Sequence, residues 1–143
     1  MHGRGARRAA LLRGAGVAVM PRSRIYAAVE VERARQDAKW GAQNHPDVDR
    51  VLVERPGRCT VARMCEEFGI PHPTRAKAEC DGAARVGQCT WAHIAVEELS
   101  ELIEAATLEA LGDGSADATD RELVQLIAVC VAWREARARR VTL

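Results

Sequence analysis

The sequence predicts an all-α fold, a bundle of about four to five helices in which the last two long helices form an antiparallel hairpin. Composition supports this class: apolar residues make up 48% of the 143 residues, and aromatic residues only 3%. Much of the apolar content is alanine, which favours helices, whereas the aromatic residues that favour strands are scarce. No alternating strand pattern competes with the helical ones.

The helix boundaries follow from capping residues, glycines and prolines. Ser23 can cap a first helix that ends near Trp40, and a turn-rich loop follows over residues 41–47. Two shorter helices are expected next, the first capped by Thr60 and ending at residue 68, the second capped by Thr74 and ending near residue 86.

Two long helices complete the bundle. Thr90 opens an acidic helix that ends near Leu111, and the last helix runs from Asp120 to about Arg139, after a polar loop over residues 112–118. The last helix has almost no polar face, which is typical of a core helix or an oligomer interface. We therefore expect a homodimer or homotetramer.

The beginning of the chain differs from the rest. Residues 1–20 contain several arginines and no acid, and we expect them to be a disordered or mis-assigned N-terminal extension, with an arginine-rich transit peptide as the alternative. Residues 21–143 are expected to form a single helical domain. No apolar run reaches the roughly 18 residues that a membrane span needs, so we expect a cytoplasmic protein without a membrane partner.

The five cysteines and the net charge indicate which kinds of site and partner to expect. The cysteine count is odd and no Cys-x-x-Cys pair is present, which favours a reduced cytosolic chain over a disulfide framework. A zinc site that combines cysteines with His72 or His93 is an alternative, but the spacings match no zinc template. A net charge of +1 and the lack of a basic recognition helix indicate no nucleic-acid partner, although the N-terminal arginines leave that rival reading open.

Carboxylates are crowded in the acidic helix. The segment between Arg85 and Arg121 contains no Lys or Arg, and its clustered acids are Glu97, Glu98, Glu101 and Glu104. Like charges at these helical spacings repel each other, and a divalent metal ion would relieve the repulsion. A helical wheel places Glu98 and Glu101 at the edge of the apolar side, with Glu97 and Glu104 further out.

The last helix offers further oxygen ligands. Glu122 and Gln125 could complete a metal site that Glu98 and Glu101 begin. One alternative is structural, because Thr119 and Glu122 match a capping box. Another is an ion pair with a cation from a different element, for which the candidates are Arg75, Lys77 and Arg121.

Residues 91–101 and 121–129 resemble the MazG-like nucleotide pyrophosphohydrolases, an all-α family with Glu-x-x-Glu on one helix and Glu-x-x-Asp on a later one. The similarity extends over about residues 24–138. The resemblance implies a magnesium site, with manganese as the alternative ion, whose ligands are Glu98, Glu101, Glu122 and Gln125. Gln125 stands where the family has an aspartate, which removes a charge from the site.

The resemblance implies an enzyme that splits a nucleoside triphosphate, NTP or dNTP, into the monophosphate and pyrophosphate. Glu97 and Glu98 would be catalytic. Residues 39–47 are similar to a loop of a small bacterial and phage branch of the family, and the candidate substrate-binding residues are Trp40, Asn44, His45, Arg75, Lys77 and Arg121. The alternative is a non-catalytic helical oligomer with a weakened metal site, which acts as an interaction or nucleotide-binding protein.

Overall fold

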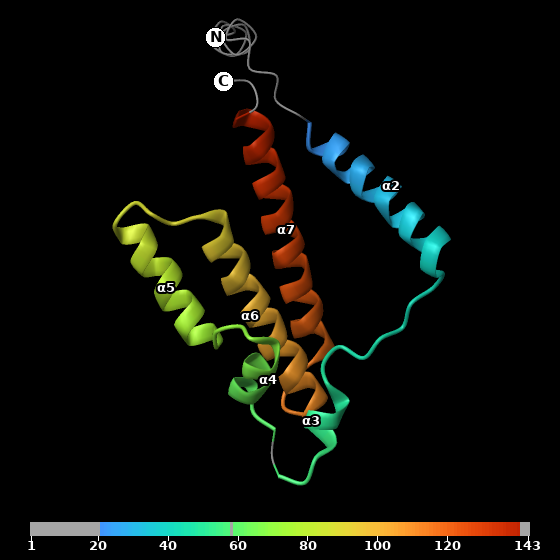
Figure 1. Cartoon of the computed structure of the whole chain (residues 1–143), viewed down its shortest axis with the longest axis vertical. Helices are drawn as coiled ribbons and strands as arrows, with labels where there is room; N and C mark the ends of the chain where they lie inside the picture. Colours follow the sequence, from blue (N-terminus) through green and yellow to red (C-terminus); the bar gives the residue numbers. More distant parts are fainter. Residues whose placement is uncertain (1–20, 58, 141–143) are drawn as a thin grey trace, which may run out of the picture. The chain divides into compact units, whose positions relative to one another are not determined.

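The structure, a computed structural model, describes residues 21–140 apart from residue 58 (Figure 1). Within this part of the chain there are six helices and no strand, which confirms the all-α class with one helix more than expected. The expected N-terminal extension over residues 1–20 lies outside the described residues. In the described part, no helix is both long enough and apolar enough to cross a membrane.

Five of the six helices coincide closely with predicted ones. In chain order the helices are α2 (Arg22–Trp40), α3 (Arg50–Glu54), α4 (Val61–Phe68), α5 (Pro73–Arg85), α6 (Trp91–Ala110) and α7 (Ala116–Arg140). The short helix α3 was not predicted, because five residues are too few to show a helical period. It begins where the Asp49 carboxylate accepts a hydrogen bond of 2.8 Å from the backbone N–H of Val51.

Helix α7 begins about one turn earlier than predicted. The hydroxyl of Ser115 accepts a hydrogen bond of 3.2 Å from the N–H of Ala118, so Ser115 stabilises the helix start. Thr119 therefore lies inside the helix, where its hydroxyl donates a hydrogen bond of 2.5 Å to the carboxylate of Glu109. The capping-box reading of Thr119 and Glu122 is wrong for this reason.

The chain divides into two compact units. The smaller one contains α2 and the end of α7 from Val131 onward. Ile25 and Val131 are buried in it, and the Arg22 guanidinium donates to the Glu135 carboxylate at 2.9 Å. The larger unit, residues 42–130, contains α3 to α6 and the first part of α7. The expected single domain over residues 21–143 stays a prediction.

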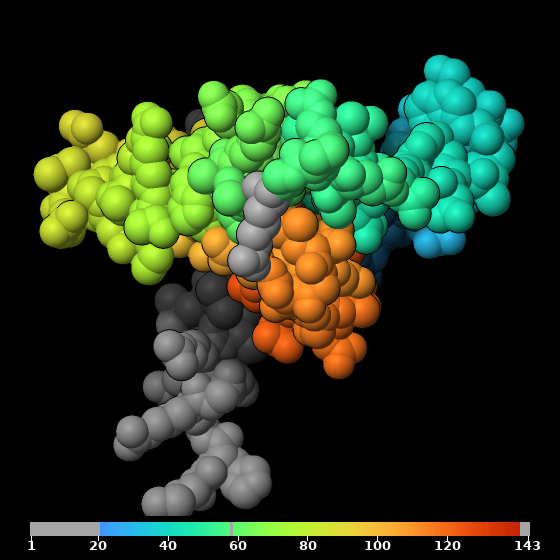
Figure 2. Space-filling view, turned by 90° about the horizontal axis from the view of Figure 1, so that it is seen from below, coloured from blue at the N-terminus to red at the C-terminus, as the bar shows by residue number. Residues whose placement is uncertain are grey.

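The larger unit has an apolar core at one end of α6. Its buried members are Val48, Leu52, Cys59, Met64 and Ala106. They come from α3, α4, α6 and the segments that flank α3 and α4. Figure 2 shows the green segments beside the orange part of the chain, in which α6 ends and α7 begins. α6 also packs along α5, so this one helix connects the core to the rest of the unit.

Replacement of Met64 by Ala is expected to destabilise the protein by about 2–5 kcal/mol, because the side chain is fully buried and its loss leaves a cavity. Urea unfolding followed by circular dichroism measures this change. Val51→Ala on α3 is the control, since Val51 is 61% exposed and its truncation should cost well under about 1 kcal/mol. Equal losses for both variants would contradict the assignment of the core.

Candidate metal centre

The start of α6 sets the register of the acidic residues. The N–H of His93 donates to the Thr90 hydroxyl at 3.2 Å, and the N–H of Thr90 donates to Nδ1 of His93 at 3.1 Å. These two bonds form a reciprocal capping box in which His93 occupies the place usually taken by Glu or Gln. From this fixed start, Glu98 and Glu101 are three residues apart and point to the same side of the helix.

Three carboxylates meet between α6 and α7. One carboxylate oxygen each from Glu98, Glu101 and Glu122 lies within 4.8 Å of the other two, and all three residues are half-buried. We call this group the carboxylate cluster. The structure therefore brings together three of the four metal ligands that the sequence suggested, although they come from two different helices.

Two oxygens of the carboxylate cluster have no hydrogen-bond partner among the described residues. They are Oε2 of Glu98 and Oε2 of Glu122, and both are buried. A buried carboxylate oxygen that accepts no hydrogen bond loses the solvation of water without compensation. These lone pairs are free to bind a cation, which is the chemical property that a metal ligand needs.

The pKa values of the cluster reflect the same crowding. Burial raises the pKa of Glu98 above its ordinary value of 4.5, and the charges of Glu122 and Glu97 raise it further. Burial likewise raises the pKa of Glu101, followed by the charges of Glu98 and Glu122, while Lys77 acts in the opposite direction. Burial and the neighbouring charges thus destabilise the ionised forms of Glu98 and Glu101.

Glu97 and Lys77 lie at the edge of the carboxylate cluster. The Lys77 ammonium is 3.9 Å from the Glu97 carboxylate and 3.4 Å from that of Asp81. The Glu97 side chain is only 16% exposed, so it is more buried than its place on the helical wheel indicated. In the described part of the chain, neither Glu98 nor Glu101 forms an ion pair, and the charge of Lys77 compensates that of Glu101 only in part.

The remaining predicted site residues are exposed. Gln125 lies one helical turn after Glu122, and Arg121 directly precedes Glu122. Arg75 pairs with Glu79 on its own helix at 2.8 Å. Roles for these three residues in a site stay predictions.

Trp40, Asn44 and His45 are also exposed. Trp40 ends α2 in the smaller unit, and the Lys39 ammonium lies 4.7 Å from its ring centroid. Asn44 and His45 precede α3 in the larger unit. Their proposed contact with a nucleotide base stays a prediction too.

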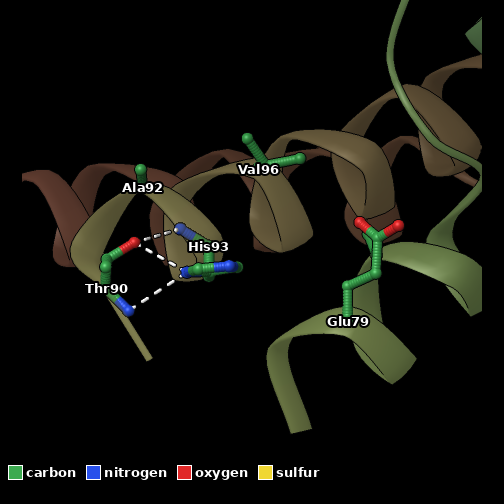
Figure 3. A pocket seen from close by; sticks show the side chains of 6 residues that line it. Glu79, Thr90, Ala92, His93 and Val96 are labelled. Carbon is green, nitrogen blue, oxygen red and sulfur yellow. Dashed lines mark hydrogen bonds between the residues drawn. The ribbon is translucent and has the colours of Figure 1, made fainter. Parts of the chain in front are cut away.

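A pocket that sequence reasoning missed lies between α5 and α6 (Figure 3). It has a volume of about 190 Å³, and its lining residues are Ala76, Glu79, Thr90, Ala92, His93 and Val96. The carboxylate cluster is not part of its lining. The volume is below the about 300–1,000 Å³ of typical ligand pockets, so it is small for a nucleotide.

The carboxylate cluster suits a hard divalent cation. Magnesium and manganese prefer carboxylate and carbonyl oxygens, and magnesium in proteins binds one or two carboxylates together with water and phosphate oxygens.

No family model, curated protein sequence or solved structure matches the chain. The three carboxylates and their two unbonded oxygens are what the structure contributes to a functional assignment.

Without divalent metal, the cluster should make stability depend on pH. The folded protein holds a proton on Glu98 or Glu101 more readily than the unfolded chain does, because their pKa is raised above 4.5. Their contribution to stability is therefore largest below that ordinary value and is lost as pH rises through the raised pKa. In a chelating buffer at neutral pH, Glu98→Gln should stabilise the protein by up to about 1 kcal/mol by urea unfolding.

The gain from Glu98→Gln should shrink as the pH falls toward 4.5, because the raised pKa of Glu98 lets the folded wild type protonate this carboxylate there. Glu66→Gln on the exposed surface of α4 is the matched control, and it should change the stability at neutral pH by no more than about 0.5 kcal/mol. A neutral-pH loss of stability in Glu98→Gln would contradict the repulsion inferred from the structure.

Proposed function

We propose that this chain is a metal-dependent nucleoside triphosphate pyrophosphohydrolase, which cleaves an NTP or dNTP to the monophosphate and pyrophosphate. The carboxylate cluster of Glu98, Glu101 and Glu122, with its two unbonded buried oxygens, is the observation that carries the proposal. The same residues match the acids by which the sequence resembles the MazG-like family. An antiparallel hairpin of α6 and α7 would place Glu122 opposite Glu98 and Glu101.

The donors of the cluster fit magnesium or manganese. Glu98, Glu101 and Glu122 would hold the ion, and Gln125 could add a neutral amide oxygen by turning its exposed side chain toward Glu122. When bound, the metal would supply positive charge that holds phosphate oxygens beside the acids and polarises the α-phosphorus. This charge is required because the cluster and a triphosphate would otherwise repel each other.

Glu97 is the proposed general base. Its side chain is only 16% exposed, and its charge acts on both Glu98 and Glu101, so it lies beside the cluster. There it would accept the proton of the water that attacks the α-phosphate. Glu98, in addition to its role as a ligand, would orient that water through a carboxylate oxygen.

The charge that develops on the leaving pyrophosphate needs cations from the chain. Lys77 is 62% exposed at the edge of the cluster, so its ammonium is mobile enough to turn toward a phosphate. Arg121 is exposed beside Glu122, whereas Arg75 would first have to leave Glu79. Lys77 is the one of the three proposed phosphate-binding residues whose charge already acts on a member of the cluster, Glu101.

Recognition of the base is assigned to Trp40, Asn44 and His45. The half-exposed ring of Trp40 offers a face on which a base can stack, and the exposed Asn44 amide and His45 imidazole offer hydrogen bonds. The proposed location of the enzyme is the cytoplasm.

The proposal is tested by pyrophosphate release from a panel of NTPs and dNTPs with magnesium. Wild type should turn over at least one of these nucleotides, and Glu98→Gln, Glu101→Gln and Glu122→Gln should each lose about 100-fold or more of kcat/KM. Even residues that only orient a metal's ligands contribute about 10- to 100-fold. Glu104→Gln is the matched control, because Glu104 lies on the same helix outside the cluster and should retain activity.

Magnesium-dependent thermal stabilisation separates the proposed enzyme from its alternative. Stabilisation by magnesium in wild type but not in Glu98→Gln, without turnover of any nucleotide, would favour the non-catalytic helical oligomer with a weakened metal site. Equal turnover in wild type and in all three cluster variants would instead remove the carboxylate cluster from the mechanism.

We also propose that a second copy of the chain covers the outer face of α7, which gives a homodimer or homotetramer. Leu123, Val124 and Ile127 are 42%, 63% and 56% exposed and lie at helical spacing on one face. Val124→Glu would place a charge in that interface and should shift sedimentation velocity to the monomer. Val86→Glu, at an equally exposed apolar residue after α5, is the control and should leave the oligomer intact. A monomeric wild type would contradict this assignment.

A further inference from the structure

Two cysteines lie side by side where α5 meets the start of α6. Sγ of Cys80, on α5, is 3.7 Å from Sγ of Cys89, which directly precedes the Thr90 cap of α6. Both thiols are free, Cys80 is buried and Cys89 is half-buried. Their proximity was not predicted, because nine positions and a helix end separate them in the sequence.

The turn between the two helices holds the sulfurs near each other. Gly87 adopts φ of 70°, a left-handed conformation that favours glycine, and its N–H donates to the carbonyl of Ala84 at 3.1 Å. The N–H of Gln88 donates to the carbonyl of Ala83 at 2.8 Å. These bonds return the chain beside α5 directly before Cys89, so the proximity of the thiols follows from the backbone.

Formation of a bond requires little movement. A disulfide has a sulfur–sulfur distance of about 2.05 Å, so the two sulfurs would have to approach by roughly 1.7 Å. Cys89 lies in the turn and not within a helix, so small rotations of its backbone and side chain can provide this approach. Neither helix has to shift as a whole.

We propose that Cys80 and Cys89 form a redox modification site, at which a low-molecular-weight disulfide oxidises the two thiols to an intramolecular disulfide.

The reaction takes two steps. Cys89, the more exposed thiol, loses its proton and attacks one sulfur of the small disulfide, so that a mixed disulfide forms and one small thiolate leaves. Cys80 then loses its proton and attacks the Cys89 sulfur, which expels the second thiolate. Two protein thiols are oxidised, one small disulfide is reduced to two thiols, and the two protons pass to the released thiolates.

The surroundings of the pair support this order of attack. Burial, and then the neighbouring Glu97 and Cys89, raise the pKa of the Cys80 thiol to about 12, so Cys80 is a poor first nucleophile. The contribution of the Cys89 thiol to this shift is lost once Cys89 is part of the mixed disulfide, which favours attack by Cys80 in the second step. The other three cysteines differ in their position. Cys59 and Cys65 are buried, Cys59 within the apolar core, and Cys130 is exposed on α7.

Peptide mapping of the full chain tests the proposal, because trypsin cleaves after Arg85, between the two cysteines. The reduced protein is treated with oxidised glutathione, its remaining thiols are alkylated, and it is digested without reductant. Peptides 78–85 and 86–121 should be joined and should separate on reduction, and the intact protein should lose about 2 Da on oxidation. A stable glutathione adduct on Cys89 without this cross-link would overturn the proposal.

Three variants make the result specific. Cys130→Ser should form the same cross-link at the same rate as wild type, since Cys130 takes no part in it. Cys89→Ser and Cys80→Ser should both abolish the link, and circular dichroism checks that each variant is folded. Cys89 is the less buried of the two, so Cys89→Ser keeps the test valid if Cys80→Ser does not fold. A cross-link that persists in Cys89→Ser would show that other thiols react.

Discussion

The larger unit has to hold three half-buried carboxylates together against their mutual repulsion. Glu98, Glu101 and Glu122 approach within 4.8 Å of one another, and two of their buried oxygens accept no hydrogen bond among the described residues. Such a group is unfavourable in its ionised form, as the raised pKa values of Glu98 and Glu101 indicate. The contacts around it must compensate, or a cation must bind.

Those contacts lie on both sides of the cluster. The apolar core around Met64 fixes one end of α6, and the capping box of Thr90 and His93 fixes the other. The hydrogen bond from Thr119 to Glu109 ties the beginning of α7 to the end of α6 near their connection. Contacts outside the cluster thus fix the ends of the helices that carry these acids. The fold therefore keeps the three carboxylates together despite their repulsion.

Much of the fold could be predicted from the sequence, because caps and turns are local signals. Thr60 and Thr90 cap α4 and α6 as predicted. The predicted cap Thr74 is wrong, because α5 begins at Pro73 and His72 caps it by accepting a hydrogen bond from the N–H of Thr74. Helix α3 was not predicted because it is short. The predicted start of α7 is wrong because Thr119 and Glu122 have the sequence spacing of a capping box without forming one. Thr119 instead donates a hydrogen bond to Glu109 on α6, and no local sequence pattern predicts this contact between two helices.

The candidate site could likewise be predicted from the sequence only where its residues share one helix. Glu98 and Glu101 share a helix, so a wheel was sufficient to place them together, and the shortage of cations between Arg85 and Arg121 made them conspicuous. The pairing of Glu97 with Lys77 depends on how α5 packs on α6, which the sequence pattern does not contain. The proximity of Cys80 and Cys89 depends on the turn geometry around Gly87 in the same way.

The position of Gln125, one helical turn after Glu122 of the carboxylate cluster, offers a physical reason for a neutral residue there. A fourth acid one turn after Glu122 would add a further charge to a group in which two oxygens are already unpartnered. A neutral amide avoids that repulsion in the metal-free protein and still offers an oxygen to a cation, at the cost of a weaker electrostatic attraction. Under the proposed function, Gln125 would thus lower the repulsion within the metal-free cluster, at the cost of a weaker attraction for a metal ion.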